Sequence, residues 1–254
     1  MPTDDAYDEL IGAATAAPIG GWSFGWLDGR VSGSDPSWSY PDLARRLLPG
    51  CHCVLDVDTG GGELLASLAP LPRHTWATES WPANVPVARA RLQPLGVTVV
   101  PATERAAGLP VADQKFDLLL NRHGHLDAAE AARVLEPGGT LLTQQVGSDD
   151  CAELNAALGA PAAHEPGSWN LATAAQALTA AGFDLGDSRE EWPILTFYDV
   201  GAVVYHLRMV SWQVPEFTVD RYDGTLRRLH ARIRTAGRLD IHAHRFLITA
   251  RLAP

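Results

Sequence analysis

The chain has 254 residues, of which 46% are hydrophobic and 20% charged, and its formal net charge is -10; these values suit a folded domain with a core and exclude global disorder. The acidity disfavours a nucleic-acid partner, since a phosphate backbone binds a concentrated positive surface. The chain has three cysteines, an odd number that makes a disulfide framework improbable. It contains no apolar run near the ~20 residues that span a bilayer, and its acidic beginning is unlike a signal peptide. We therefore expect a cytoplasmic protein that binds no membrane.

The first part of the chain divides near residue 37. Residues 1–37 are rich in Gly, Ser, Asp and Trp and show little periodicity, so we expect an irregular N-terminal arm or cover. Residues 38–254 are expected to form a single domain. Ser39 is a favoured N-cap residue, which predicts a helix from there to Pro49-Gly50.

Strands and helices then alternate. The predicted strands are VLDV, TWATE, VTVVPA, FDLLLN and TLLTQQV, and the predicted helices between them are GELLASLAP, PVARARLQPLG and LDAAEAARVL. This alternation indicates parallel βαβ units, an α/β fold whose sheet is covered on both faces.

The pattern loosens after Val146. We predict a helix from Leu171 to Ala181, a strand near Phe183 and a last strand in HRFLITARL. Residues 198–240 read as a mostly helical insertion between the last two strands, and we expect it to pack over the active-site edge of the sheet.

The segment VLDVDTGGGE places a glycine-rich turn directly after the first strand of the sheet. Glycines there let the backbone approach a ligand that lies outside the carboxyl ends of the strands. A carboxylate that accepts ribose hydroxyls is required at the end of the next strand, where Glu79 stands. A nicotinamide dinucleotide needs a third glycine at position 65, which is Leu65, so an oxidoreductase is disfavoured.

Four motifs in this order and spacing, VLDVDTGGGE, TWATES, FDLLLNRH and RVLEPGGTLLTQQV, resemble the class I S-adenosylmethionine-dependent methyltransferases. The finer text TESWPANVPVARARL, NRHGH, TQQVG and FYDVGAVVYHL resembles an uncharacterised bacterial branch of that family. The resemblance implies a Rossmann-like, mostly parallel sheet of seven strands whose last strand is antiparallel, with a helical lid insertion. It also implies S-adenosyl-L-methionine as the cofactor.

The resemblance also implies roles for single residues. Asp56 would orient the loop and the methionine amine, Glu79 would hold the ribose hydroxyls, and Asn121 would lie near the methionine or the sulfonium. Asp58 replaces the first glycine of the family's loop, and we expect the site to tolerate it. The remaining cofactor-binding residues implied are Gly60, Gly62, Ser80 and, near adenine, Thr103 or Glu104.

The residues that would contact the methyl acceptor are sought beyond the ends of the predicted strands. His123 follows the fourth strand and is the candidate catalytic base, since histidine titrates near neutrality; its alternative is a bond to backbone or a cover for the cofactor. Candidates for the acceptor pocket are His125, Trp81, Tyr198, Tyr205 and Gln145. No metal ligand set is predicted.

The favoured function is O- or N-methylation of a small-molecule acceptor by a monomer or homodimer. Two alternatives stay open. Methylation of RNA or protein would use the arginines between Arg227 and Arg238, and a non-catalytic cofactor-binding protein would be consistent with Asp58 in the loop.

Overall fold

The computed structural model describes residues 5–19, 24–102 and 108–254, and the chain divides into two compact units. Unit 1 comprises Met1–Pro36, Ser148–Ser168 and Glu191–His244, and unit 2 comprises Ser37–Gly147, Trp169–Glu190 and Arg245–Pro254. This grouping differs from the expected arm and single domain, because the N-terminal residues share a unit with the expected insertion. The packing of that insertion over the sheet stays a prediction.

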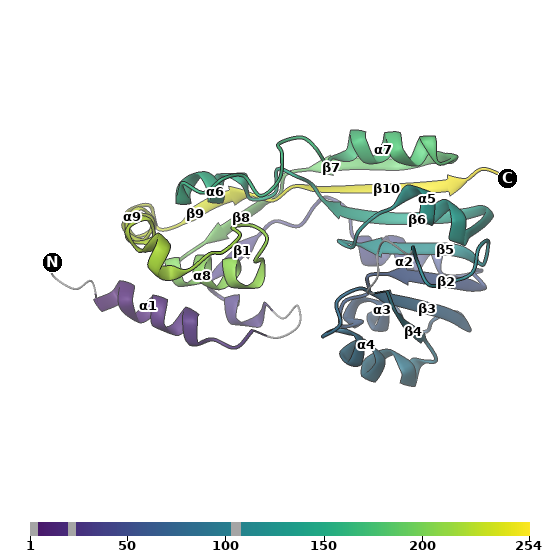
Figure 1. The fold of residues 1–254 in the computed structure, drawn as a ribbon, viewed down its shortest axis with the longest axis horizontal. Helices are drawn as coiled ribbons and strands as arrows, with labels where there is room; N and C mark the ends of the chain where they lie inside the picture. The colour runs from purple at the N-terminus through teal and green to yellow at the C-terminus, as the bar shows by residue number, and fades with distance from the viewer. Residues whose placement is uncertain (1–4, 20–23, 103–107) are drawn as a thin grey trace. The chain divides into compact units, whose positions relative to one another are not determined.

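Unit 2 is built on a seven-stranded sheet with the order β4-β3-β2-β5-β6-β10-β7 (Figure 1). Its strands are β2 (Cys53–Val57), β3 (His74–Glu79), β4 (Thr98–Pro101), β5 (Phe116–Arg122), β6 (Leu135–Val146), β7 (Phe183–Glu191) and β10 (Arg245–Leu252). β2 pairs in parallel with β3 and β5, β3 with β4, and β5 with β6. β10 runs antiparallel to β6, which confirms the predicted α/β sheet.

Side chains alternate between the two faces of this sheet, as the period of two requires. In β5, Leu118 and Leu120 join one core cluster and Leu119 joins the other, and all three are at most 2% exposed. The helices of unit 2 are α2 (Tyr40–Leu47), α3 (Glu63–Ser67), α4 (Val85–Leu92), α5 (Ala128–Val134) and α7 (Leu171–Ala180), with a 3-10 turn at Gln93–Leu95. Residues of α2, α3 and α4 belong to the first cluster and residues of α5 and α7 to the second.

The predicted helix at Ser39 is confirmed. The Ser39 hydroxyl accepts a hydrogen bond from the Asp42 N–H, and α2 follows it directly. The strand order reverses between β2 and β5, since the chain builds outward from β2 to β3 and β4 and then returns to β5. Ligands in such open sheets bind outside the carboxyl ends of the strands at this reversal.

Unit 1 has its own core and a small antiparallel sheet. Its strands β1 (Val31–Gly33), β8 (Ile194–Phe197) and β9 (Leu239–His242) pair in that order. The helices of unit 1 are α1 (Asp5–Ala16), α6 (Ala152–Leu158), α8 (Val200–Met209) and α9 (Val219–Ala236), with a 3-10 turn at Gly25–Leu27. Tyr7, Phe197 and Leu226 are among its fully buried residues.

Two sequence expectations about unit 1 need correction. The N-terminal segment is not irregular throughout, because α1 forms a helix of 12 residues. Its two buried residues are Tyr7 and Ala14, and its small apolar side chains give only a weak periodic signal. The three-stranded sheet was not predicted, because strands of three or four residues carry too few alternations.

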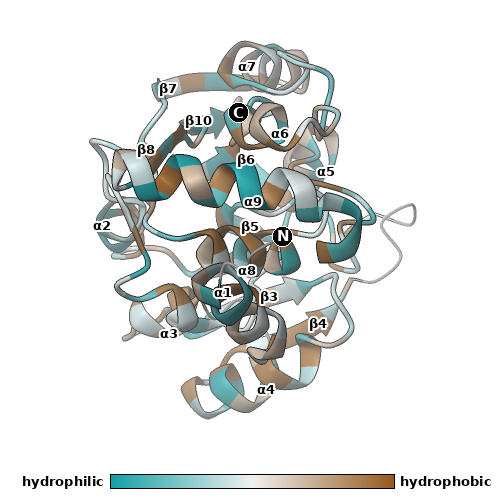
Figure 2. Cartoon of the chain, turned by 90° about the vertical axis from the view of Figure 1, so that its left-hand side faces the viewer, coloured by the Kyte–Doolittle hydropathy of each residue, from teal (hydrophilic) through white to brown (hydrophobic). Residues whose placement is uncertain are grey.

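Two arginines of α9, Arg221 and Arg227, form ion pairs with acidic residues. Hydrophilic and hydrophobic residues alternate along this helix (Figure 2). Arg227 pairs with Asp8 and Asp223, and beyond the helix Arg238 pairs with Asp240. The helix therefore offers less net positive charge than its sequence suggests, which weakens the case for a nucleic-acid surface. No helix in the described part of the chain has the length and apolarity needed to cross a bilayer.

Candidate active site

The glycine loop after β2 has a backbone that side chains rarely adopt. The φ angles of Asp58, Gly60 and Gly62 are 55°, 65° and 79°. A Cβ on Gly62 would lie 2.7 Å from Cγ of Leu92, which is fully buried in α4. Glycine at position 62 is therefore required by both conformation and space.

Glu79 ties the end of β3 to this loop. Its Oε2 accepts a hydrogen bond from the Gly60 N–H at 2.6 Å, and its Oε1 accepts one from the Trp81 N–H at 2.7 Å. Burial raises the pKa of Glu79, and these two N–H groups oppose that rise. Each carboxylate oxygen can accept more than one hydrogen bond, so Glu79 keeps the capacity to accept from a ligand hydroxyl.

Asp56 lies beneath the loop and is 6% exposed. Burial raises its pKa to about 7, a hydrogen bond with Thr59 lowers it, and the charges of Asp58 and Glu79 raise it further. Three carboxyl groups therefore share one small region of negative potential. A cation bound beside them would relieve their mutual repulsion.

Asp58 joins the loop after β2 to the loop after β5. Its Oδ2 accepts a hydrogen bond from the His125 N–H at 3.0 Å. A Cβ on Gly124 would lie 2.5 Å from Cβ of Asp58, so the close approach of the two loops requires glycine at 124. The side chain that replaces the family's glycine thus has a structural role here.

A cleft that is open to solvent lies at the carboxyl ends of the strands of unit 2. Four predicted site residues line it: Asp58, Ser80, Asn121 and His125. Thr103 and Glu104 lie outside the described residues. The cleft also has an apolar wall that sequence reasoning missed, formed by Val57, Ala102, Leu109, Leu119, Leu126 and Ala131. Two of them, Val57 at the end of β2 and Ala102 directly after β4, stand at carboxyl ends of predicted strands, which was the available signal.

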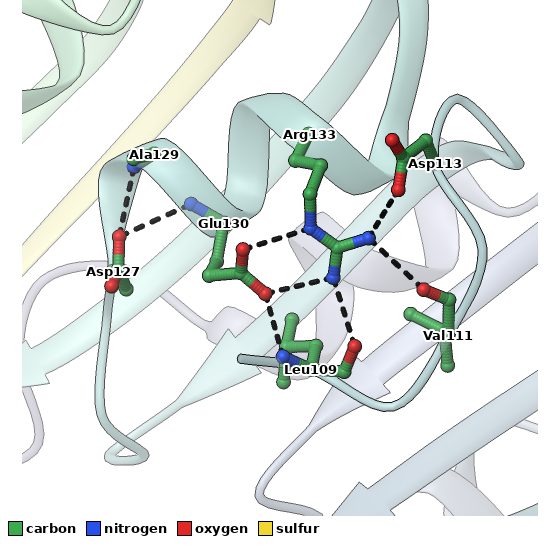
Figure 3. A network of polar contacts seen from close by, with 7 residues as sticks. All are labelled: Leu109, Val111, Asp113, Asp127, Ala129, Glu130 and Arg133. Atoms are coloured by element: carbon green, nitrogen blue, oxygen red, sulfur yellow. Dashed lines mark hydrogen bonds and ion pairs between the residues drawn. The ribbon is translucent and has the colours of Figure 1, made fainter. Parts of the chain in front are cut away.

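One wall of the cleft is held by a network centred on Arg133 of α5 (Figure 3). The Arg133 guanidinium binds both carboxylate oxygens of Glu130 at 2.8 Å and donates to the carbonyls of Leu109 and Val111 at 2.8 and 3.0 Å. Glu130 in turn accepts the Leu109 N–H at 2.6 Å. Gly108 has a φ of 76°, and a Cβ there would lie 2.6 Å from Glu130.

Asn121 is held by a buried network of the sheet. Its Oδ1 accepts from Thr143 Oγ1 at 3.0 Å and from the Gln145 amide, and its amide donates to the Val57 carbonyl at 3.3 Å. Gln145 is 4% exposed and also donates to Thr143 at 2.8 Å. The Gln145 side chain thus contacts Asn121 within the sheet, and the acceptor contact predicted for it stays a prediction.

His123 has a left-handed backbone with a φ of 61°. Its N–H donates to the Gln144 carbonyl at 2.7 Å, and its Nε2 lies 2.8 Å from Nε2 of Gln144. The protein around the imidazole and the cations Arg122 and Arg245 lower the pKa of His123 well below its usual value. The residue as a whole is exposed to solvent. A base role for His123 stays a prediction.

The aromatic candidates differ in their surroundings. Trp81, after β3, is 65% exposed, and Tyr198 in unit 1 is 45% exposed with its hydroxyl 2.7 Å from Ser32 Oγ. Tyr205 is 2% exposed in the core of unit 1, where its ring stacks on Trp26 at 4.8 Å. The pocket role predicted for Tyr205 is therefore corrected to core packing.

Comparisons with known proteins agree with this geometry. Residues 54–139 match a family model described as a methyltransferase domain. Over 96 residues the chain is 28% identical to a ubiquinone biosynthesis O-methyltransferase of Cereibacter sphaeroides, which covers 35% of this chain and 39% of that protein. Over 115 residues it is 32% identical to a ubiquinone/menaquinone biosynthesis C-methyltransferase of Cupriavidus pinatubonensis, covering 41% and 47%. The chain thus spans less than half the length of these relatives.

The fold has matches among solved structures. The YcgJ protein of Bacillus subtilis aligns with a TM-score of 0.59 over 85% of this chain and 98% of that chain, at 19% identity. This likeness concerns the fold alone. Residues 54–139 therefore resemble a methyltransferase domain, and they lie in unit 2, which has a Rossmann-like, mostly parallel sheet.

Proposed function

We propose that unit 2 binds S-adenosylmethionine in its cleft and that the protein transfers the methyl group to an oxygen or nitrogen of a small molecule. One observation carries this proposal: the glycine loop is surrounded by the carboxyl groups of Asp56, Asp58 and Glu79. Such a site favours a ligand with cationic groups, and this cofactor carries a sulfonium and an ammonium.

The residues present fit this cofactor. Glu79 is held by the loop N–H groups and can still accept ribose hydroxyls. The apolar wall with Leu109 and Leu126 suits a planar base. The cleft-lining residues in the described part of the chain include no lysine or arginine, which disfavours a dinucleotide with its two phosphate charges.

When bound, the cofactor supplies an electrophilic methyl group. The protein's own contribution is to hold the cofactor and the acceptor in line, because positioning provides a large share of such a rate enhancement. Asp56 offers a carboxylate to the amine, Glu79 orients the ribose, and the Asn121 network fixes the end of β5 beside the cleft.

The proposed class of methyl acceptor rests on the charge of the protein and on the names of its relatives. The relatives are named for quinone biosynthesis, and the net charge of -10 disfavours an RNA acceptor. We therefore propose a small aromatic acceptor with a hydroxyl or amino group.

Calorimetric titration with S-adenosylmethionine, S-adenosylhomocysteine and NAD tests the cofactor. We expect micromolar binding of the first two and no binding of NAD. Glu79→Gln keeps the size of the side chain but loses its charge, and should weaken binding by about 1–3 kcal/mol. Exposed Asp42, which pairs with Arg45 in α2, provides the control variant Asp42→Asn with wild-type affinity. Absence of any cofactor binding by the wild-type protein would refute the proposal.

With the cofactor bound, a screen of catechols, phenols, quinols and aromatic amines then identifies the acceptor, read as S-adenosylhomocysteine release. Binding without turnover on any acceptor would favour a non-catalytic cofactor-binding protein.

A further inference from the structure

The side chains of Trp38, Gln144 and His123 form a chain of hydrogen bonds within unit 2. Trp38 Nε1 lies 2.8 Å from Oε1 of Gln144, and Nε2 of Gln144 lies 2.8 Å from Nε2 of His123. Trp38 is 6% exposed and Gln144 is 4% exposed. The partner of the histidine side chain, Gln144, is therefore buried and is held in place by buried Trp38.

The direction of these bonds follows from their chemistry. The indole N–H of Trp38 can only donate, so the Gln144 group that faces it must be the carbonyl oxygen. The amide NH₂ of Gln144 then faces His123 and donates, which makes Nε2 of His123 an acceptor without a proton. The proton of the neutral imidazole accordingly resides on Nδ1.

We infer that Trp38, through Gln144, holds His123 as the Nδ1–H tautomer, so that His123 donates a hydrogen bond to the methyl acceptor and is not its general base. A base would need an unoccupied, unprotonated ring nitrogen, and here Nε2 is occupied and Nδ1 carries the proton. Trp38 and Gln144 are positioning residues in this arrangement. The inference rests on the proposed function for its acceptor.

This role fixes the proton balance of the transfer. The lone pair of the acceptor oxygen or nitrogen forms the bond to the methyl carbon, and the carbon–sulfur bond breaks with its electron pair left on sulfur. The acceptor proton goes to solvent, before the transfer for a phenol that binds as its anion. His123 keeps its own proton and orients the acceptor.

The first experiment determines the tautomer by ¹⁵N NMR of the histidine ring in the complex with S-adenosylhomocysteine. The wild-type protein should show an unprotonated Nε2 and a pKa of His123 below the usual value for histidine. In Gln144→Glu the carboxylate accepts a proton from Nε2, so the tautomer should reverse and the pKa should rise. Trp38→Phe should leave a mixture of tautomers, because the amide is no longer oriented.

Trp76→Phe serves as the matched control, since Trp76 packs against Phe116 on the same sheet and should leave the His123 signals unchanged. An Nε2–H tautomer in the wild-type protein, or signals that Gln144→Glu does not move, would overturn the inference. Calorimetry with S-adenosylhomocysteine distinguishes this failure from failure of the proposed function. If S-adenosylhomocysteine binds, only the inference about His123 fails; if it does not bind, the proposed function fails.

The second experiment compares turnover of two variants on the acceptor found by the screen. Asn tolerates the left-handed backbone at 123, and its amide N–H stands near the place of Nδ1–H, yet it cannot accept a proton as a base. His123→Asn should retain turnover within about threefold, whereas His123→Ala should lose on the order of 10²-fold, as when one positioned donor is removed. The base role would be supported if both variants lost turnover equally and if both also abolished a fall in turnover at acidic pH that the wild-type protein shows.

Discussion

Asp56 carries a buried carboxyl group beside the glycine loop, where we propose that the cationic groups of the cofactor bind. Burial raises its pKa from 3.8 to about 7, so near neutrality the free protein holds a proton there for part of the time. A bound ammonium group favours the carboxylate, and binding therefore releases that proton.

The first prediction is that cofactor affinity falls as the pH drops below about 7, by at most about tenfold per pH unit, and is flat above pH 8. Calorimetry between pH 5.5 and 8.5, in buffers of different ionisation enthalpy, measures both the affinity and the proton released. Asp56→Asn should bind more weakly at pH 8 and lose the pH dependence. The same slope in this variant would show that another group titrates.

The second prediction compares substitutions at two glycines, so that the cost of backbone strain can be told apart from the cost of crowding. Gly62 and Gly96 have φ angles of 79° and 80°, but a Cβ at 62 meets buried Leu92 whereas a Cβ at 96 meets nothing within 4 Å. Gly96→Ala should cost about 1–2 kcal/mol from the left-handed backbone alone. Gly62→Ala should cost about 1–3 kcal/mol more from overpacking. Urea unfolding gives both values, and equal costs would mean that Leu92 moves aside freely.

At the scale of elements, Arg133 connects α5 to the segment 108–113 through a planar fork of donors. Lysine cannot reproduce this fork. The third prediction is that Arg133→Lys lowers the free energy of unfolding by about 1–3 kcal/mol and speeds amide exchange at Leu109. The control Arg45→Lys alters an exposed pair with Asp42 and should change stability by less than ~0.5 kcal/mol. Unchanged exchange at Leu109 would mean that other contacts hold the segment.

The elements that the sequence predicted are those with a strong local pattern. The apolar runs of β2, β5 and β10 and the capped helix α2 are clear in isolation. β7 was predicted only near Phe183, because the rest of FDLGDSREE is largely exposed and lacks alternation. The short strands of unit 1 gave no signal of their own.

In the candidate site, too, the sequence predicted the parts that lie in local motifs and missed those that depend on distant contacts. The glycine loop and Glu79 were found because each lies in a short continuous motif, VLDVDTGGGE and TWATES. The hydrogen bond from Trp38 to Gln144 joins residues 106 positions apart, so no local pattern could reveal the tautomer of His123. Tyr205 was misplaced because an aromatic residue on a helix reads the same whether it faces a pocket or a core.

At the scale of the whole molecule, the two units have separate cores. α1 contributes Tyr7 to the core of unit 1, where its hydroxyl donates to Asp223 at 2.9 Å and Arg227 lies 4.1 Å from the ring centre. The fourth prediction is that Tyr7→Ala destabilises this unit by about 3–5 kcal/mol, read as faster hydrogen exchange in α8 and α9. Tyr198→Ala, at a half-exposed position, is the control with a small effect. Unchanged protection in α8 and α9 would show that α1 is dispensable.

The position of β10 in the sheet has a consequence for biosynthesis. β7 stands at the end of the strand order and joins the sheet through β10, which the ribosome completes later than every other strand of that sheet. Newly made β7 must therefore wait with an unpaired edge while all of α8 and α9 is translated. Its charged residues Asp184, Asp187, Arg189 and Glu190 suit that interval, because charge on an unpaired strand discourages pairing with other nascent chains.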